Sequence, residues 1–194
     1  MKRSRIFYGW WVVVGCFLVA LCASCARYSF TGIFPAMLED LGWTKGMVGF
    51  GFTLHMWVYA IMAIFVGRSV DKFGARWVMV AGAFITLIGM CLLSTVNEVW
   101  QFYLFYSVIA AIGVSATYFV PVTVTMRKWF VKRAGLATGI VLAGSGLGIG
   151  VITPILGPFI SSYGWRTSFV IVGIALGVIG FLSAIILVRK DPES

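Results

Sequence analysis

Six long apolar segments, separated by short polar connectors, constrain this sequence more than any other feature. About 20 apolar residues in a helix cross a hydrocarbon core about 30 Å thick. In lipid every backbone N–H and C=O must be bonded within the chain, which a helix achieves and an open strand does not. We therefore expect an all-α membrane protein, a bundle of six transmembrane helices within residues 1–194. The segments span roughly residues 8–37, 46–67, 77–96, 100–126, 135–160 and 166–188.

The composition agrees with a lipid environment. The chain is 61% hydrophobic and 11% charged, more apolar than a soluble chain of 194 residues can cover. A net charge of +9 would suggest nucleic acid in a soluble protein. Here the charges lie at the ends of apolar segments, so we expect no nucleic-acid partner. The first segment is longer than the apolar core of a signal peptide and five more follow, so we interpret it as a retained helix.

The basic residues are distributed unevenly over the connectors. Positive charge gathers in cytoplasmic loops, so both termini are expected in the cytoplasm of a multi-pass protein of a bacterial inner or plasma membrane. Only Lys45 and Arg166 fall on the other side of the membrane, and Arg27 lies within it. The residues on the cytoplasmic side are Lys2, Arg3, Arg5, Arg68, Lys72, Arg76, Arg127, Lys128, Lys132, Arg133, Arg189 and Lys190.

The most polar connector joins the second and third segments and reads Gly-Arg-Ser-Val-Asp-Lys-Phe-Gly-Ala-Arg over residues 67–76. Its short length makes the two helices antiparallel neighbours. Gly74 suits a turn with positive φ, and Gly67 suits a close approach of backbones. The Asp71 carboxylate can accept hydrogen bonds from nearby cations or from a helix N-terminus.

The spacing Gly-x-x-x-Asp-Lys-x-Gly-x-Arg in this connector resembles the loop between helices two and three of the major facilitator superfamily. Residues 8–13, 28–30, 33–35, 41–43 and 129–139 narrow the resemblance to the bacterial monocarboxylate transporters and the oxalate–formate antiporters. Ile109 stands four residues before Gly113, where many relatives carry an arginine. This departure argues against the drug–proton antiporter branch.

The resemblance implies the amino-terminal half of a twelve-helix fold, built as a 3+3 inverted repeat. It implies secondary active transport of small monocarboxylates or related organic anions by alternating access, as proton symport or anion exchange. The missing carboxy-terminal half, or a second copy, would be the protein partner, and membrane lipid the surroundings. It also implies a cytoplasmic gate in which Asp71 faces a helix N-terminus of the other half. Its candidate gating residues are Gly67, Asp71, Lys72, Gly74, Arg76 and Arg127.

Arg27 is the most informative single residue. A cation near mid-membrane costs about 2.5 kcal/mol or more and usually faces a cavity or a partner. It lies 12 residues from Glu39, about 18 Å along a helix, which is too deep for easy snorkelling. We expect it to bind a carboxylate substrate. The alternative is a structural partner for backbone carbonyls or a helix dipole.

Three further residues are candidates for the substrate site. Family likeness places a substrate-contacting polar residue of the first segment near Ser29 and an aromatic of the fourth at Tyr118, although Tyr118 could equally serve packing. His55, the only histidine, could relay protons. A neutral His55 bonded to Tyr59 is the interpretation we favour. Tyr103 and Tyr106 are expected in the interfacial aromatic belt.

Catalytic chemistry is not expected, because the apolar segments contain no Asp or Glu. No acid–base pair or metal cluster is available, so we predict neither an enzyme nor a cofactor. Cys22 and Cys25 have redox-motif spacing but lie in mid-helix, where packing explains them better. The glycines of residues 144–150, and the pairs Gly135/Gly139 and Gly173/Gly177, suit close helix packing.

Two alternatives to an anion transporter remain open. One is a non-transporting bundle that acts as a structural or assembly partner. The other is a superfamily carrier of a different substrate class.

Overall fold

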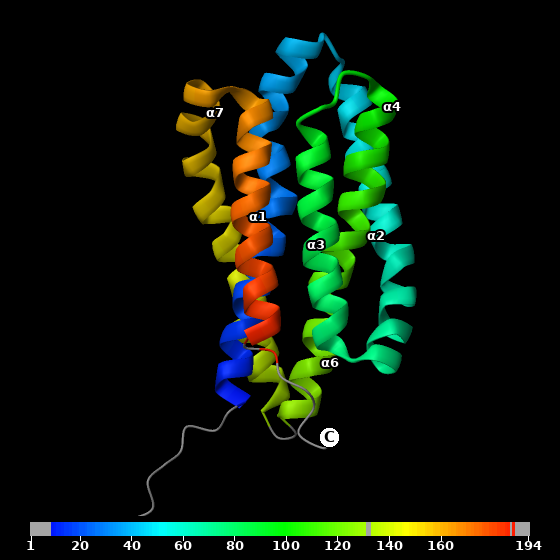
Figure 1. Cartoon of the computed structure of the whole chain (residues 1–194), viewed down its shortest axis with the longest axis vertical. Coiled ribbons are helices and arrows are strands. Elements are labelled where there is room, and N and C mark those ends of the chain that lie inside the picture. Colours follow the sequence, from blue (N-terminus) through cyan, green and yellow to red (C-terminus); the bar gives the residue numbers. More distant parts are fainter. Residues whose placement is uncertain (1–8, 131–132, 187, 189–194) are drawn as a thin grey trace, which may run out of the picture.

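The computed structural model describes residues 9–130, 133–186 and 188. Expectations that concern Lys2, Arg3, Arg5, Lys132, Arg189 and Lys190 lie outside these residues. The described part is all helical, and six of its helical stretches are long and apolar enough to cross a membrane. They stand side by side, with chain reversals at alternate ends (Figure 1). The expected all-α, six-helix bundle is confirmed.

The first three spans are regular helices: α1 (Gly9–Leu41), α2 (Lys45–Phe73) and α3 (Ala75–Leu93). The Thr44 side chain caps α2 by accepting a hydrogen bond from the Met47 N–H at 3.3 Å. The reversals fall at Gly42, with φ 65°, and at Gly74, with φ 83°. The turn expected at Gly74 is therefore confirmed, since positive φ favours glycine.

The polar connector of residues 67–76 is almost entirely helical, because α2 continues to Phe73 and α3 begins at Ala75. The polar side chains of this connector are compatible with a helix, and within residues 67–76 only Gly74 lies outside the helices. The close approach expected at Gly67 is not found. Within the described part of the chain, a Cβ added there would meet only Val120 Cγ1 at 3.9 Å, an ordinary van der Waals contact.

The fourth span, Val99–Trp129, is interrupted twice. It consists of α4 (Val99–Phe102), the π-helix η1 (Tyr103–Ala110), α5 (Ala111–Thr117) and α6 (Phe119–Trp129). Between α5 and α6, Tyr118 has φ −103° and ψ −117°. Pro121, three residues later, has no N–H to continue the backbone hydrogen bonds of the helix, so the helix breaks before it.

The fifth and sixth spans form one long element, α7 (Ala134–Ile186), which reverses at Gly164, where φ is 75°. The part before Gly164 packs closely on α1: a Cβ on Gly148 would lie 3.0 Å from Leu21 O. The part after Gly164 packs on α3, where a Cβ on Gly177 would lie 2.6 Å from Leu87 Cδ1. Close packing is thus confirmed for these stretches. Gly135 and Gly139 have no atom of the described chain within 4 Å of an added Cβ.

The fourth span lies along α2 and is bonded to it by side chains. Tyr103 Oη donates to Met47 O at 3.0 Å, Ser107 Oγ to Gly51 O at 2.7 Å, and Ser115 Oγ to Tyr59 O at 3.3 Å. Each pair is separated by 56 residues. A constant separation along two helices means that they run parallel. We call these three bonds the hydroxyl ladder.

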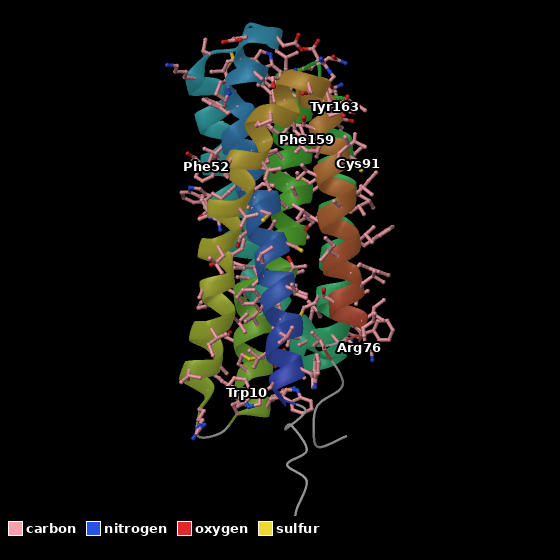
Figure 2. The ribbon with its side chains drawn as sticks, turned by 90° about the vertical axis from the view of Figure 1, so that its left-hand side faces the viewer. Trp10, Phe52, Arg76, Cys91, Phe159 and Tyr163 are labelled. Carbon is pink, nitrogen blue, oxygen red and sulfur yellow. The ribbon has the colours of Figure 1, made fainter. Side chains whose placement is uncertain are left out.

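The two ends of the bundle differ in charge. We call the end with Gly74 the basic end, because Arg68, Lys72, Arg76 and Arg127 lie there. Trp10 and Arg76 mark this end in Figure 2, and Phe159 and Tyr163 mark the opposite end.

The opposite end carries a polar cluster around Asp40. Asp40 Oδ2 accepts hydrogen bonds from Trp165 Nε1 at 3.0 Å and from Arg166 Nη1 at 2.7 Å. Arg166 Nη2 also donates to Val96 O at 3.2 Å and to Asn97 Oδ1 at 3.0 Å. The cluster therefore joins α1, the α3–α4 connector and the second half of α7.

Replacing Asp40 with asparagine should change stability by less than about 1 kcal/mol, because exposed ion pairs contribute little. Asp40→Ala should cost more, since it also leaves the buried Trp165 N–H without its acceptor. Thermal unfolding in detergent at low and high salt would measure both variants. A large, salt-sensitive loss in Asp40→Asn would contradict this expectation.

Candidate functional site

Arg27 lies half-buried on α1, facing α2. Its Nη2 donates to the thioether sulfur of Met56 at 2.8 Å. The guanidinium carbon lies 5.4 Å from the ring centroid of Tyr59 and 5.6 Å from that of Tyr28. A thioether is a weak acceptor, and cation–π contacts contribute about 0.5–2 kcal/mol. The cation is therefore held by weak partners.

Three polar atoms around this position are buried and have no hydrogen-bond partner in the described part of the chain. They are Arg27 Nε, His55 Nε2 and Tyr106 Oη. An unsatisfied buried donor or acceptor costs about 1–3 kcal/mol, so such groups need a reason in a folded protein. The His55 and Tyr106 rings stack with their centroids 4.6 Å apart, and Arg27 interacts electrostatically with both residues.

His55 connects α2 to the π-helix. Its Nδ1 lies 2.9 Å from Tyr106 O. A carbonyl only accepts, so Nδ1 carries the proton and Nε2 of the neutral ring is an acceptor. This contact differs from the expected bond to Tyr59. The difference arises because Tyr106 is 51 residues away in another span, and residue spacing within α2 cannot reveal such a partner.

The Tyr106 ring is stacked between neighbours from two helices. Its centroid lies 4.1 Å from that of Phe30 on α1 and 4.6 Å from that of His55 on α2. Only 1% of Tyr106 is exposed, so its expected place in the interfacial belt is wrong. The π-helix inserts its ring into the core, and π-bulges often mark functional sites.

Tyr59 links Arg27 to the break in the fourth span. Besides its contact with Arg27, Tyr59 interacts electrostatically with Tyr118 and with the Phe119 backbone. Tyr118 is half-buried at the break between α5 and α6. The structure thus brings Tyr118 to the neighbourhood of Tyr59.

Ser29 is not brought to this cluster. It is fully buried, and its hydroxyl donates to Ala26 O of its own helix at 2.8 Å. Sequence reasoning, in turn, overlooked Tyr28, Met56, Tyr59 and Tyr106 around Arg27. The one-residue spacing of Tyr28 was available as a signal; the contacts from other spans were not.

The candidate gating residues lie at the basic end. Arg76 Nη2 donates to Ile185 O at 2.7 Å, near the end of α7. Lys72 Nζ lies 5.1 Å from the Phe73 ring centroid. Asp71 and Arg127 are exposed, on the last turns of α2 and α6. A cation at the carboxyl end of a helix is favourable, so Arg76 stabilises the last turn of α7.

A bundle of six spans around a weakly held intramembrane cation defines an integral multi-pass membrane protein. The profile of the Major Facilitator Superfamily matches residues 16–194. The chain belongs to this superfamily, a family of transporters, and the expected membership is confirmed.

Individual relatives agree with the expected branch. The chain is 29% identical to the "Oxalate:formate antiporter" of Oxalobacter formigenes, over 92% of this chain and 42% of that protein. It is 30% identical to "Monocarboxylate transporter 4" of Gallus gallus, over 86% of this chain and 35% of that protein. It is 33% identical to "MFS-type transporter 1" of Ophiocordyceps sp. (strain BCC 1869), over 77% of this chain and 33% of that protein. The chain thus spans between a third and about two-fifths of the length of these relatives.

Proposed function

We propose that this chain is the amino-terminal six-helix half of a secondary transporter for small monocarboxylates or related organic anions. The observation that carries the proposal is Arg27, a mid-membrane guanidinium. Among the described residues its Nε has no hydrogen-bond partner and its Nη2 donates only to a thioether. Relatives named as monocarboxylate transporter and oxalate–formate antiporter support the same substrate class.

Arg27 would hold the substrate carboxylate. A guanidinium presents its N–H groups as a planar fork that matches the two oxygens of a carboxylate. A carboxylate is a stronger acceptor than the Met56 sulfur and would displace it. Tyr28 and Tyr59 would supply apolar faces for a short carbon chain, together with Tyr118 across the break in the fourth span.

The coupling chemistry follows from the lack of acidic residues in the apolar segments. Proton symport would then use the substrate's own carboxyl, His55 or a group contributed by the partner half. Anion exchange needs no protonatable residue, because one anion replaces another at Arg27. Rocking of the two halves would expose the site to each side of the membrane in turn.

The remaining half, or a second copy, would close the site from the other side. The basic end would face the cytoplasm, as the positive-inside rule implies. Asp71, with Lys72, Gly74, Arg76 and Arg127 around it, would form the gate there. In this arrangement both termini are cytoplasmic.

Exchange of labelled lactate, formate or oxalate tests the proposal. Proteoliposomes that contain the complete product of the gene should take up at least one of these anions in a saturable manner. Uptake should be inhibited by other short carboxylates and not by a neutral analogue such as lactamide. Saturable uptake of neutral solutes only would identify a carrier of another class, and no flux of any solute would favour a structural role.

A further inference from the structure

An apolar groove lies on the outside of the bundle at the basic end, away from Arg27. Its walls are α2, from Met62 to Phe73, and α3, from Trp77 to Ile85. Its floor is α5, through Ile112 and Ala116. The groove encloses about 600 Å³, within the range of about 300–1,000 Å³ that holds a small ligand.

The length of the groove matches one leaflet of a bilayer. Met62 and Phe73 are 11 residues apart, about 16 Å along a helix. The hydrocarbon core is about 30 Å thick, so one leaflet is about 15 Å deep. A transmembrane helix of a partner would need a groove along the whole core. The dimensions therefore favour an acyl chain over a protein helix.

Three basic residues are sequence neighbours of residues that line this groove at the basic end. Arg68 is exposed and precedes the lining residue Ser69. Lys72 Nζ lies 5.1 Å from the ring centroid of the lining residue Phe73. Arg76 lies over Trp77, although its Nη2 is already bonded to Ile185 O.

Asp71 is the only acidic residue of α2 and α3, so the mouth keeps a net positive charge. Basic pockets between spans suit anionic lipid headgroups. Apolar walls of one-leaflet length beneath a basic mouth fit a lipid with a negatively charged headgroup.

We propose that the groove between α2 and α3 is a binding site for an anionic phospholipid. One acyl chain lies between Phe65 and Ala81, and the headgroup phosphate contacts Arg68 and Lys72. This site is separate from the anion site at Arg27 and does not depend on which substrate is transported.

Native mass spectrometry of the 194-residue chain, released from micelles, tests the site. The micelles hold phosphatidylglycerol and phosphatidylcholine with identical acyl chains at equal concentration. We expect one phosphatidylglycerol to be retained about tenfold more often than phosphatidylcholine, because two basic residues favour the anionic headgroup. Equal retention of the two lipids would overturn the proposal.

Two sets of variants test the acyl-chain contacts and the headgroup contacts separately. Ala81→Phe fills the groove from an exposed position and should abolish retention of either lipid, whereas Ala81→Ser leaves the groove open and should not. The double variant Arg68→Gln/Lys72→Gln should reduce the retention of phosphatidylglycerol to that of phosphatidylcholine. Arg133→Gln, on the connector between α6 and α7, is the matched control and should retain the wild-type preference.

Three outcomes would contradict the lipid site. Unchanged retention in Ala81→Phe would mean that the groove does not hold the lipid. An equal loss in Arg133→Gln would mean that surface charge alone is responsible. A dimeric wild type that Ala81→Phe converts to a monomer would mean that a second copy occupies the groove. Circular dichroism of each variant confirms its helical fold.

Discussion

Replacing Arg27 with glutamine is expected to lower kcat/KM for anion uptake by about 10- to 100-fold. A hydrogen bond to a charged group contributes about 1.5–3 kcal/mol, and 1.4 kcal/mol corresponds to a factor of ten. Arg27→Lys keeps the charge but loses the planar fork, so an intermediate loss is expected. The measurement is uptake of labelled anion by proteoliposomes with the complete gene product.

Expression and insertion of the Arg27→Gln protein should equal or exceed those of the wild type, because the variant no longer places a cation within the membrane. Lys45→Gln, at the start of α2 and exposed, is the matched control for loss of one positive charge and should leave uptake unchanged. Normal uptake by an inserted Arg27→Gln protein would remove Arg27 from the substrate site.

Replacing Gly113 with valine should destabilise the bundle by about 3 kcal/mol or more, since overpacking of a close helix contact is poorly relieved. A Cβ on Gly113 would lie 2.4 Å from Thr86 Oγ1 and 2.6 Å from Thr86 N. The hydroxyl can rotate away, but the backbone nitrogen moves only with the whole of α3. The thermal unfolding midpoint in detergent measures the loss.

Gly146→Val is the matched control, because an added Cβ at Gly146 has no atom of the described chain within 4 Å. Its unfolding midpoint should stay close to that of the wild type. A similar loss in both variants would show that valine in a glycine-rich span, rather than the contact between α3 and α5, causes the effect.

The number of spans and the turn at Gly74 could be predicted from sequence, because apolar length and positive φ are local properties. Arg27 could also be singled out, since a charge within an apolar run is visible without a structure. Its surroundings could not. Tyr59 and Tyr106 reach it from other spans, and their register depends on contacts between helices that are far apart in the sequence.

The π-helix at Tyr103–Ala110 was equally hidden. Tyr106 lies in its first turn, and the burial of Tyr106 depends on stacking against Phe30 and His55, which belong to other spans. The substrate role of Ser29, expected from family likeness, stays a prediction. Two residues along a helix turn a side chain by about 200°, so Ser29 points away from Arg27 and its hydroxyl donates to Ala26 O.

The hydroxyl ladder joins α2 and the part of the fourth span from Tyr103 to Ser115 into one rigid unit. Sliding one helix past the other by a turn would break all three bonds together, each contributing about 0.6 kcal/mol in a membrane. The last bond of the hydroxyl ladder is at Ser115, three residues before the break at Tyr118. Any bending of this span would therefore concentrate at the break before α6 and would leave the contacts of Arg27 with Tyr28 and Tyr59 in place.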